Sequence, residues 1–278
     1  MTGYKPILRY HGGKSVLGPW LLDHFPAHRI YVEPFAGSAS VLLRKRRVYS
    51  ECINDLNAGV VNLFTVLRDP VLSGELERVT RLTPFSRDEF KAAHVAATDP
   101  VERARRFVIR SYMGFGSNST SMASGFRSCS NRSGSTPAHD WSRWPDRIAY
   151  ATNRLRGVVI ENRDACDVML AHDGPETLHY CDPPYVLDTR TASNGYEHDF
   201  TDADHERLAE CLHGLDGMVV LSGYPSALYG RLFGGWTRIE RDSLADGAKP
   251  RREVLWLNPS ASTALDREGA PLLAMLPA

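Results

Sequence analysis

The first 65 residues show the hydrophobic pattern of strands that alternate with helices. Ile30 and Val32 indicate a strand, and the apolar run at 41–43 begins a helix after a glycine turn. A second strand ends at Asn54-Asp55, and residues 58–69 have the apolar spacing of a helix. Because strands that alternate with helices pair in parallel, this stretch predicts an α/β fold with helices on both faces of a sheet.

The same alternation returns after residue 145. The pattern there predicts several strands and helices, which would complete one mostly parallel sheet. Helices are expected at 145–156, around 165–172 and at 201–213, and strands at 157–164, 177–181, 217–224 and 253–258.

Between these two stretches the pattern changes to helices. Capping boxes at 86–89 and 99–102 each open a helix, and the second has proline at its first helical position. The second helix is expected to present an apolar face that runs to Phe115. We therefore predict a catalytic core and a helical insertion. The core consists of residues 1–65 and 146–278, and the insertion of residues 66–145.

A long polar loop and a local excess of positive charge mark the insertion. Eight of the nineteen residues in 117–135 are serine, and a loop this long inside a domain is usually functional or disordered. The chain has zero net charge, yet residues 101–160 carry ten arginines and three acidic residues. Such clustering is typical of a surface that binds a polyanion, although a solvated helix face has the same composition.

The remaining composition excludes several classes of protein. Five cysteines without a C-x-x-C pair argue against a disulfide framework, so we expect a cytoplasmic location. The sequence shows neither an apolar run of membrane-spanning length nor a signal-peptide pattern. The histidines lack metal-ligand spacing. We expect a monomer without a metal site or a membrane partner.

The stretch "HYCDPPY" at 179–185 is the most informative part of the sequence. A predicted strand ends just before Asp182, which places the next four residues at the carboxyl edge of the sheet, where open α/β sheets bind ligands. Pro183 and Pro184 fix two φ angles and remove two backbone donors. Asp182 supplies an acceptor and Tyr185 a stacking face, which together suit the exocyclic amine of a purine. A plain Pro-Pro turn is the alternative interpretation.

Two glycine-containing segments bear on the cofactor. "GGKS" at 12–15 resembles the end of a phosphate-binding loop, but Leu8 stands where that motif needs its first glycine. "VEPFAGSAS" at 32–40 lacks the dinucleotide pattern, and Asp55 ends the next strand, where an acid commonly binds ribose hydroxyls. The combination favours a nucleoside cofactor without a pyrophosphate, S-adenosylmethionine, whose carboxylate is expected to meet Lys14.

Four motifs in this order resemble those of the alpha-type (Dam-like) DNA adenine N6-methyltransferases. They are Y-H-G-G-K at 10–14, E-P-F-A-G at 33–37, N-D-L-N at 54–57 and D-P-P-Y at 182–185. The resemblance covers about 1–65 and 150–258. It implies a Rossmann-like, S-adenosylmethionine-dependent core that methylates adenine N6 at specific sites in double-stranded DNA. The candidate cofactor-binding residues are Tyr10, Lys14, Glu33, Phe35, Gly37, Asp55, Asp164 and Asp182, and the catalytic ones are Asp182, Pro183, Pro184 and Tyr185.

Two segments depart from the family pattern. Ala39 stands where the family usually has a second glycine, and the family's recognition segment with its F-N-x-P-F-G run is absent. The serine-rich loop at 116–134 occupies its place, so the target sequence of known members does not carry over. We predict that this loop and the basic helix face before it contact DNA, through Arg103, Arg106, Arg110, Arg127 and Arg132.

The resemblance implies in-line methyl transfer to an adenine that has left the duplex. Asp182 and the Pro183 carbonyl would accept hydrogen bonds from the amine and localise its lone pair. Tyr185 would stack on the base, so Tyr185→Phe is expected to retain much activity. Three alternatives stay open: a methyltransferase for RNA or a protein amide, a catalytically silent DNA-binding module, and a nucleotide hydrolase.

Overall fold

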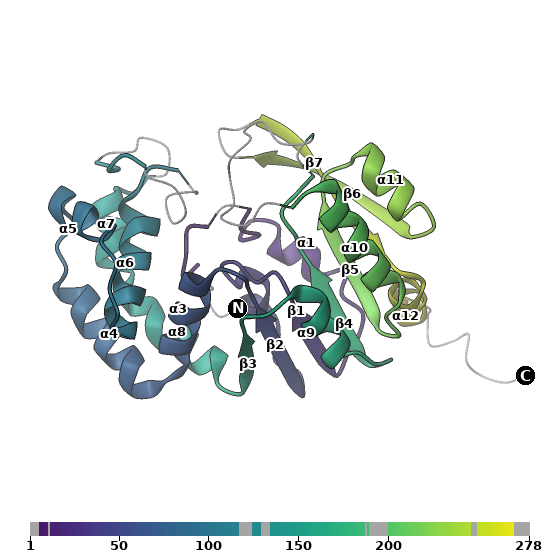
Figure 1. Ribbon diagram of the computed structural model, residues 1–278, viewed down its shortest axis with the longest axis horizontal. Helices are drawn as coiled ribbons and strands as arrows, with labels where there is room; N and C mark the ends of the chain where they lie inside the picture. Colours follow the sequence, from purple (N-terminus) through teal and green to yellow (C-terminus); the bar gives the residue numbers. More distant parts are fainter. Residues whose placement is uncertain are drawn as a thin grey trace, which may run out of the picture.

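One sheet and a lobe of helices beside it make up the described part of the chain (Figure 1). A computed structural model provides the structure. It describes residues 6–10, 12–116, 124–128, 134–186, 188, 200–245 and 249–269, and the side chains of 243–250 and 269 are not described.

The sheet has seven strands in the order β3-β2-β1-β4-β5-β7-β6. The first five strands of this order pair in parallel, whereas β7 runs antiparallel to both β5 and β6. The expected Rossmann-like α/β fold is therefore confirmed. The strands are β1 (Ile30–Glu33), β2 (Ser50–Asn54), β3 (Val158–Glu161), β4 (Thr177–Cys181), β5 (Met218–Gly223), β6 (Thr237–Ala245) and β7 (Lys249–Leu257).

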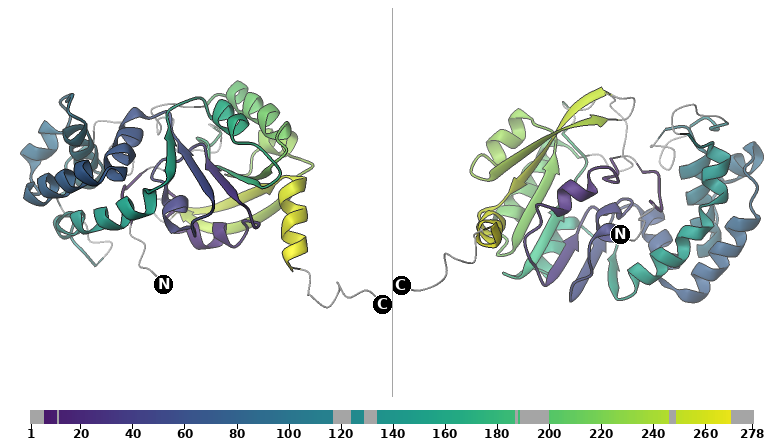
Figure 2. Two further views of the ribbon diagram at one scale, coloured as in Figure 1. Left: turned by 90° about the horizontal axis from the view of Figure 1, so that it is seen from below. Right: turned by 180° about the vertical axis from the view of Figure 1, so that it is seen from behind.

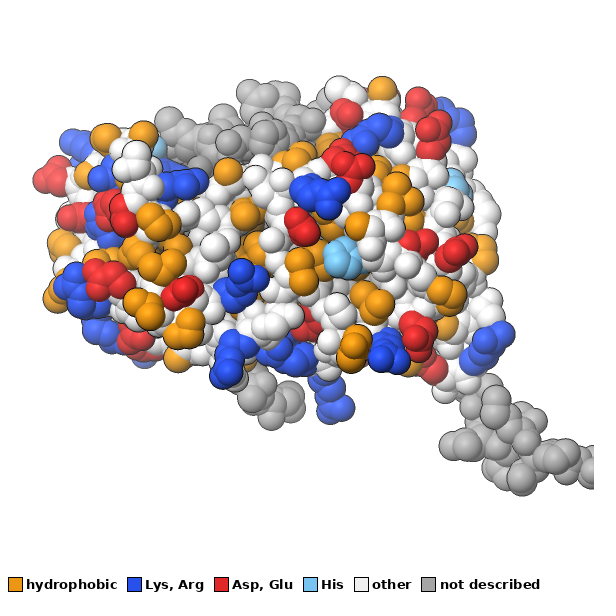
Figure 3. All heavy atoms as spheres, turned by 60° about the horizontal axis from the view of Figure 1, so that its bottom comes forward, with side chains coloured by type: hydrophobic (Ala, Val, Ile, Leu, Met, Phe, Trp, Pro, Cys, Tyr) orange, Lys and Arg blue, Asp and Glu red, His pale blue; other side chains and the backbone are white. Residues whose placement is uncertain are grey.

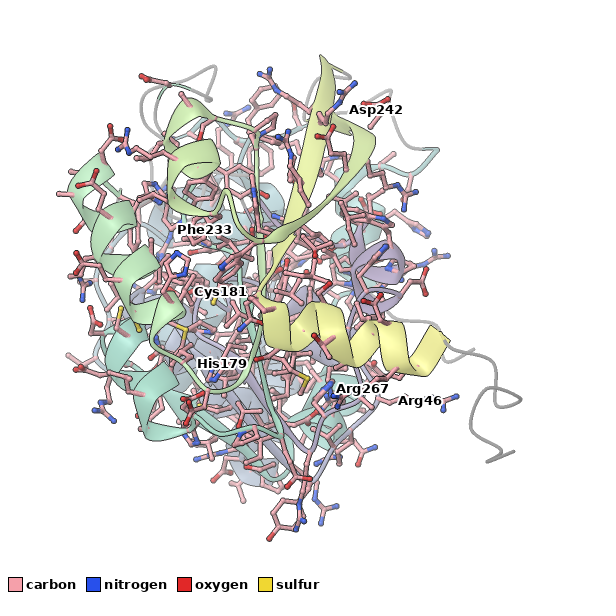
Figure 4. The ribbon with its side chains drawn as sticks, turned by 90° about the vertical axis from the view of Figure 1, so that its right-hand side faces the viewer. Arg46, His179, Cys181, Phe233, Asp242 and Arg267 are labelled. Carbon is pink, nitrogen blue, oxygen red and sulfur yellow. The ribbon has the colours of Figure 1, made fainter. Side chains whose placement is uncertain are left out.

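Strands β6 and β7 form a long hairpin that extends past the end of β5. The pairing of β5 with β7 ends at Gly223 and Val254, while β6 and β7 stay paired as far as Ala245 and Lys249. Asp242 lies on this overhanging part (Figure 4). The sequence pattern missed β6 and the first residues of β7, because both are rich in charged residues rather than apolar ones.

Helices cover both faces of the sheet (Figure 2). Successive side chains of a strand point to opposite faces, and accordingly Tyr31 and Val32 of β1 belong to two different hydrophobic clusters. The Tyr31 cluster includes residues of α1 (Gly18–Leu22), α2 (Ser40–Arg44) and α12 (Pro259–Gly269). The Val32 cluster includes residues of α9 (Ala165–Ala171), α10 (Asp202–His213) and α11 (Ala227–Leu232).

The remaining helices form the helical lobe, on the left of Figure 1. Its buried side chains Val60, Phe107 and Trp144 belong to the same cluster as Tyr31, so one core runs from the lobe into the sheet. The division at residues 66 and 145 stays a prediction. The lobe comprises α3 (Ala58–Arg68), α4 (Pro70–Leu82), α5 (Arg87–Ala92), α6 (Pro100–Met113), α7 (Pro137–Ser142), the 3₁₀ turn Pro145–Arg147 and α8 (Ile148–Leu155).

The predicted helix starts in the lobe are confirmed, but one predicted face is too long. The side chains of Ser86 and Asp99 accept hydrogen bonds from the backbone N–H groups of Glu89 and Glu102. Helix α6 ends at Met113, and Phe115 beyond it is 72% exposed, so its predicted place on the apolar face is wrong. The chain leaves the helix at Gly114 and pairs there with Phe126 in a single antiparallel bridge.

Candidate active site

A cavity lies at the carboxyl ends of β1, β2 and β4. The loops after these three strands line it, together with the segment around Gly12–Lys14 and with Phe200. The carboxyl edge is where open α/β sheets bind small organic ligands. Of the residues predicted to bind the cofactor, seven line this cavity: Tyr10, Lys14, Glu33, Phe35, Gly37, Asp55 and Asp182.

The loop after β1 depends on Gly37 and Asp55. Gly37 has φ 49°, and a Cβ added there would lie 3.0 Å from the ring of Tyr10. Asp55 Oδ2 accepts a hydrogen bond from the Gly37 N–H at 2.7 Å, and Oδ1 accepts one from Asn57 at 2.8 Å. Glycine therefore permits both the left-handed turn and the close approach of Tyr10. Ala39, with φ 48°, adopts the same left-handed region despite its methyl group.

Glu33 is a buried carboxyl group at the end of β1. Its Oε2 accepts hydrogen bonds from the Tyr31 hydroxyl and from the Leu42 backbone N–H, each at 3.0 Å. Burial raises the pKa of Glu33 to about 8, because the charged form loses its hydration. The group is therefore mostly protonated at neutral pH in this structure.

An ion pair between Lys14 and Asp182 joins two of the predicted motifs. The Lys14 ammonium donates to Oδ1 of Asp182 at 2.8 Å and to Oδ2 at 2.7 Å, and also to the Gly12 carbonyl at 3.0 Å. The same ammonium lies 4.8 Å from the centroid of the Tyr185 ring. One cation thus contacts both the carboxylate and the aromatic ring of the D-P-P-Y loop.

Two residues of the neighbouring strands β5 and β7 support this loop, and the sequence motifs did not identify either. The Ser222 hydroxyl donates to Asp182 Oδ1 at 2.7 Å. The Tyr185 hydroxyl donates to Oε2 of the buried Glu253 at 3.0 Å. Tyr224 packs edge-on against Tyr185, with ring centroids 4.5 Å apart. Residues 219–226 lie outside the four motifs, and only the sheet shows which loop the serine and the tyrosine of this segment contact.

The remaining predicted residues differ in their relation to the cavity. Pro184 lines it, whereas Pro183 is buried. Asp164 caps α9 by accepting from the Cys166 N–H and pairs with Arg207 at 2.7 Å, and it does not line the cavity. These contacts keep the carboxylate of Asp164 at the start of α9, with Ala165 as the lining residue beside it.

The arginines predicted to bind DNA differ in how much the protein itself engages them. Arg103 is exposed. Arg106 donates to Glu102 and to the Val95 carbonyl, and Arg110 donates to the Ala93 carbonyl. Arg127 lies beside the bridge between Gly114 and Phe126, and its backbone N–H donates to the Met113 carbonyl. Arg132 lies outside the described residues.

Basic and acidic side chains are interspersed on the face shown in Figure 3, over both the helical lobe and the sheet. Some of the arginines counted along residues 101–160 pair with acidic side chains of the lobe itself, as Arg105 does with Glu89 and Glu102.

Comparison with known proteins identifies the family. A family model described as "D12 class N6 adenine-specific DNA methyltransferase" matches residues 10–233, which include all the loops that line the cavity. This match confirms the resemblance carried by the four motifs. No curated protein matches the sequence.

The described residues show no arrangement for a metal ion and no helix that could cross a membrane. Within the part of the chain that the structure describes, no group of three or more His, Cys, Asp or Glu residues is arranged to hold a metal ion. Among the helices of the same residues, none combines the length and the apolar character that a membrane span requires.

Because the pKa of Glu33 is raised, we expect the stability of the cofactor-free protein to depend on pH. Because the pKa of Glu33 is about 8 in the folded protein against an ordinary value of 4.5, the contribution of this group to the stability of the fold is complete below pH 4.5 and is lost as the pH rises to 8. Glu33→Gln keeps an acceptor for Tyr31 and Leu42 but cannot ionise. The variant should therefore gain stability over wild type between these pH values, by a few kcal/mol at most. Thermal denaturation at a series of pH values measures this, and parallel curves for the two proteins would contradict it.

The geometry at Gly37 predicts a substitution effect larger than backbone strain alone. Gly37→Ala and Gly134→Ala both place a methyl group on a left-handed residue, at a cost of about 1–2 kcal/mol. Only at Gly37 does the new methyl meet the Tyr10 ring, since nothing lies within 4 Å of a Cβ at Gly134. Urea denaturation should show the greater loss for Gly37→Ala, and equal losses would refute the close approach of Tyr10.

Proposed function

The chain belongs to the D12 class of N6 adenine-specific DNA methyltransferases, and from this premise we propose that it transfers the methyl group of S-adenosylmethionine to adenine N6 at specific sites in double-stranded DNA. The observation that carries the proposal is the D-P-P-Y loop at the edge of the cavity. There the Lys14 ammonium contacts both the Asp182 carboxylate and the Tyr185 ring, so an amine in its place would contact both groups as well.

The lining of the cavity is compatible with S-adenosylmethionine. Asp55 offers carboxylate oxygens that suit the ribose hydroxyls, and Lys14 offers a cation that suits the methionine carboxylate. Phe35 and Phe200, whose ring centroids are 5.6 Å apart, offer apolar surface for the adenine of the cofactor. When bound, this cofactor supplies a methyl group on a positively charged sulfur, which a weak nucleophile can attack.

The role proposed for Asp182 is to activate the target amine. The amine of adenine is a poor nucleophile because its lone pair is delocalised into the ring. A hydrogen bond from the amine to Asp182, and another to the Pro183 carbonyl, would localise that pair on nitrogen and hold it in line with the methyl group. Ser222 keeps the carboxylate in position through the 2.7 Å bond to Oδ1.

Lys14 must move away from Asp182 before the amine can bind there. Its ammonium now donates to both carboxylate oxygens and lies over the Tyr185 ring, so it fills the positions proposed for the amine and the base. The methionine carboxylate of the cofactor provides the other anion for this cation. We propose that cofactor binding draws Lys14 from Asp182 and so prepares the base site.

Recognition of duplex DNA is proposed to involve the helical lobe and the loop at 116–134. Exposed Arg103 is the basic residue of α6 best placed to bind a phosphate, because Arg106 and Arg110 hold α6 to the chain around residues 93–96. Residues 117–123 and 129–133 lie outside the described residues, so the contacts proposed for them rest on the composition of the sequence.

A methyl-transfer assay tests the proposed function. Wild type with methyl-labelled S-adenosylmethionine and duplex DNA should place the label on adenine N6, as read by mass spectrometry of the nucleosides. Asp182→Ala should lose nearly all turnover, since the amine loses its charged acceptor. Asp167→Ala, which removes an exposed carboxylate from α9, should remain active. Label found only on RNA or on protein would favour the alternative methyltransferases and contradict the proposal.

Calorimetry tests the assignment of the cofactor. Asp55→Ala should weaken S-adenosylmethionine binding by about 1.5–3 kcal/mol, the range for hydrogen bonds to a charged group. Because Asp55 also accepts hydrogen bonds from the N–H groups of Gly37 and Asn57, the melting temperature of the variant is measured alongside. Asp55→Asn retains one acceptor oxygen, so its affinity for the cofactor should fall between those of wild type and Asp55→Ala. Tight binding of ATP without any response to S-adenosylmethionine would refute the assignment.

A further inference from the structure

Glu253 is a buried acidic residue whose carboxylate faces the D-P-P-Y loop. It lies on β7, in the part of the hairpin that extends beyond the pairing with β5, and is 7% exposed. Its Oε2 accepts a hydrogen bond from the Tyr185 hydroxyl at 3.0 Å. The catalytic scheme above gives Tyr185 a stacking role and leaves this carboxylate unused.

Burying a carboxylate at this position costs hydration energy, and packing of the core does not require an acid there. Burial raises the pKa of Glu253, while the nearby Lys14 cation opposes that shift and Asp182 adds to it. An apolar residue would fill the same space on the strand without losing hydration energy, so stability alone does not account for an acid there. The Tyr185 hydroxyl is the hydrogen-bond partner that the acid gains in return.

The hydrogen bond to Glu253 holds the hydroxyl end of the Tyr185 ring. The edge-on contact with Tyr224 is 4.5 Å between centroids at an interplanar angle of 69°, and the Lys14 ammonium lies on the ring at 4.8 Å. Once Lys14 leaves, the ring loses that contact. The bond between the hydroxyl and Glu253 and the edge-on contact with Tyr224 do not involve Lys14, so both can still orient the ring.

We infer that Glu253 is a positioning residue, which holds the Tyr185 ring at the orientation needed to stack on the extrahelical adenine. The inference rests on the proposed function. Tyr185 and Asp182 belong to one loop stiffened by two prolines, so a tilt of the ring is passed on to the carboxylate that accepts the amine. The effect of losing Glu253 is therefore expected in the capture of the base and in turnover rather than in the binding of the cofactor, because most residues that line the cofactor cavity lie on other segments.

Three variants separate this role from a structural one. Glu253→Gln keeps an oxygen that accepts the Tyr185 hydroxyl, Glu253→Leu removes it at similar volume, and Tyr185→Phe removes the same hydrogen bond without touching β7. Glu253→Gln should stay within about threefold of wild type in kcat/KM for duplex DNA. Glu253→Leu and Tyr185→Phe should each lose about tenfold, the effect of one hydrogen bond. This result would replace the expectation from the sequence that Tyr185→Phe retains much activity.

Several readouts are measured together on the full chain. Cofactor affinity by calorimetry should be unchanged in all three variants. The fluorescence of 2-aminopurine at the target position should show weaker capture of the base in Glu253→Leu and Tyr185→Phe. The double variant Tyr185→Phe with Glu253→Leu should be no worse than either single one, since both remove the same bond. If Glu253→Leu misfolds, Tyr185→Phe carries the test alone.

The outcomes distinguish the inference from the function on which it rests. Wild-type rates for Tyr185→Phe, or losses that add up in the double variant, would overturn the role of Glu253 while leaving methyl transfer intact. An equal loss in Glu253→Gln and Glu253→Leu would also overturn it, because the acceptor oxygen would then not matter. A wild-type protein that fails to methylate DNA would overturn the proposed function, and the inference with it.

Discussion

The ion pair between Lys14 and Asp182 is the interaction on which the site depends. It links residues 168 positions apart, and it brings the N-terminal segment onto the D-P-P-Y loop at the edge of the sheet. Both groups are largely withdrawn from water, with side chains 5% and 16% exposed, so removing either would leave the other charge poorly compensated. The other features of the site are arranged around this pair. Ser222 binds the carboxylate, and Tyr185 lies under the ammonium.

The same ion pair also constrains how the proposed reaction can proceed. While Lys14 donates to both oxygens of Asp182, no amine can do so at the same positions. A ligand that offers Lys14 a second anion would loosen this contact, and the carboxylate of Asp182 would then be available to another donor, such as the target amine. Filling of the cofactor cavity and opening of the base site would then be coupled, since one side chain takes part in both.

Much of the fold and part of the site followed from the sequence, for identifiable physical reasons. Buried parallel strands are short and apolar, so β1, β4 and β5 were visible in the pattern, whereas β6 pairs at the edge of the sheet and carries too many charges to be recognised. Lys14, Asp55 and Asp182 stand in motifs whose order implied that they meet. Ser222 and Glu253 reach the D-P-P-Y loop through strand order and register, which the pattern of single residues does not encode. The engagement of Arg106 and Arg110 by backbone carbonyls was equally hidden, because it depends on how the chain returns after α5.

The affinity for duplex DNA with and without S-adenosylhomocysteine tests the central claim most directly. This compound carries the carboxylate that Lys14 would bind but no methyl group, so binding is measured without turnover. The duplex contains the site found by mapping methylated adenines. Saturating S-adenosylhomocysteine should tighten binding by wild type on the order of tenfold, a common size for coupling between two sites, and this coupling should disappear in Lys14→Ala. Equal affinity with and without the compound in wild type, or undiminished coupling in Lys14→Ala, would contradict the account.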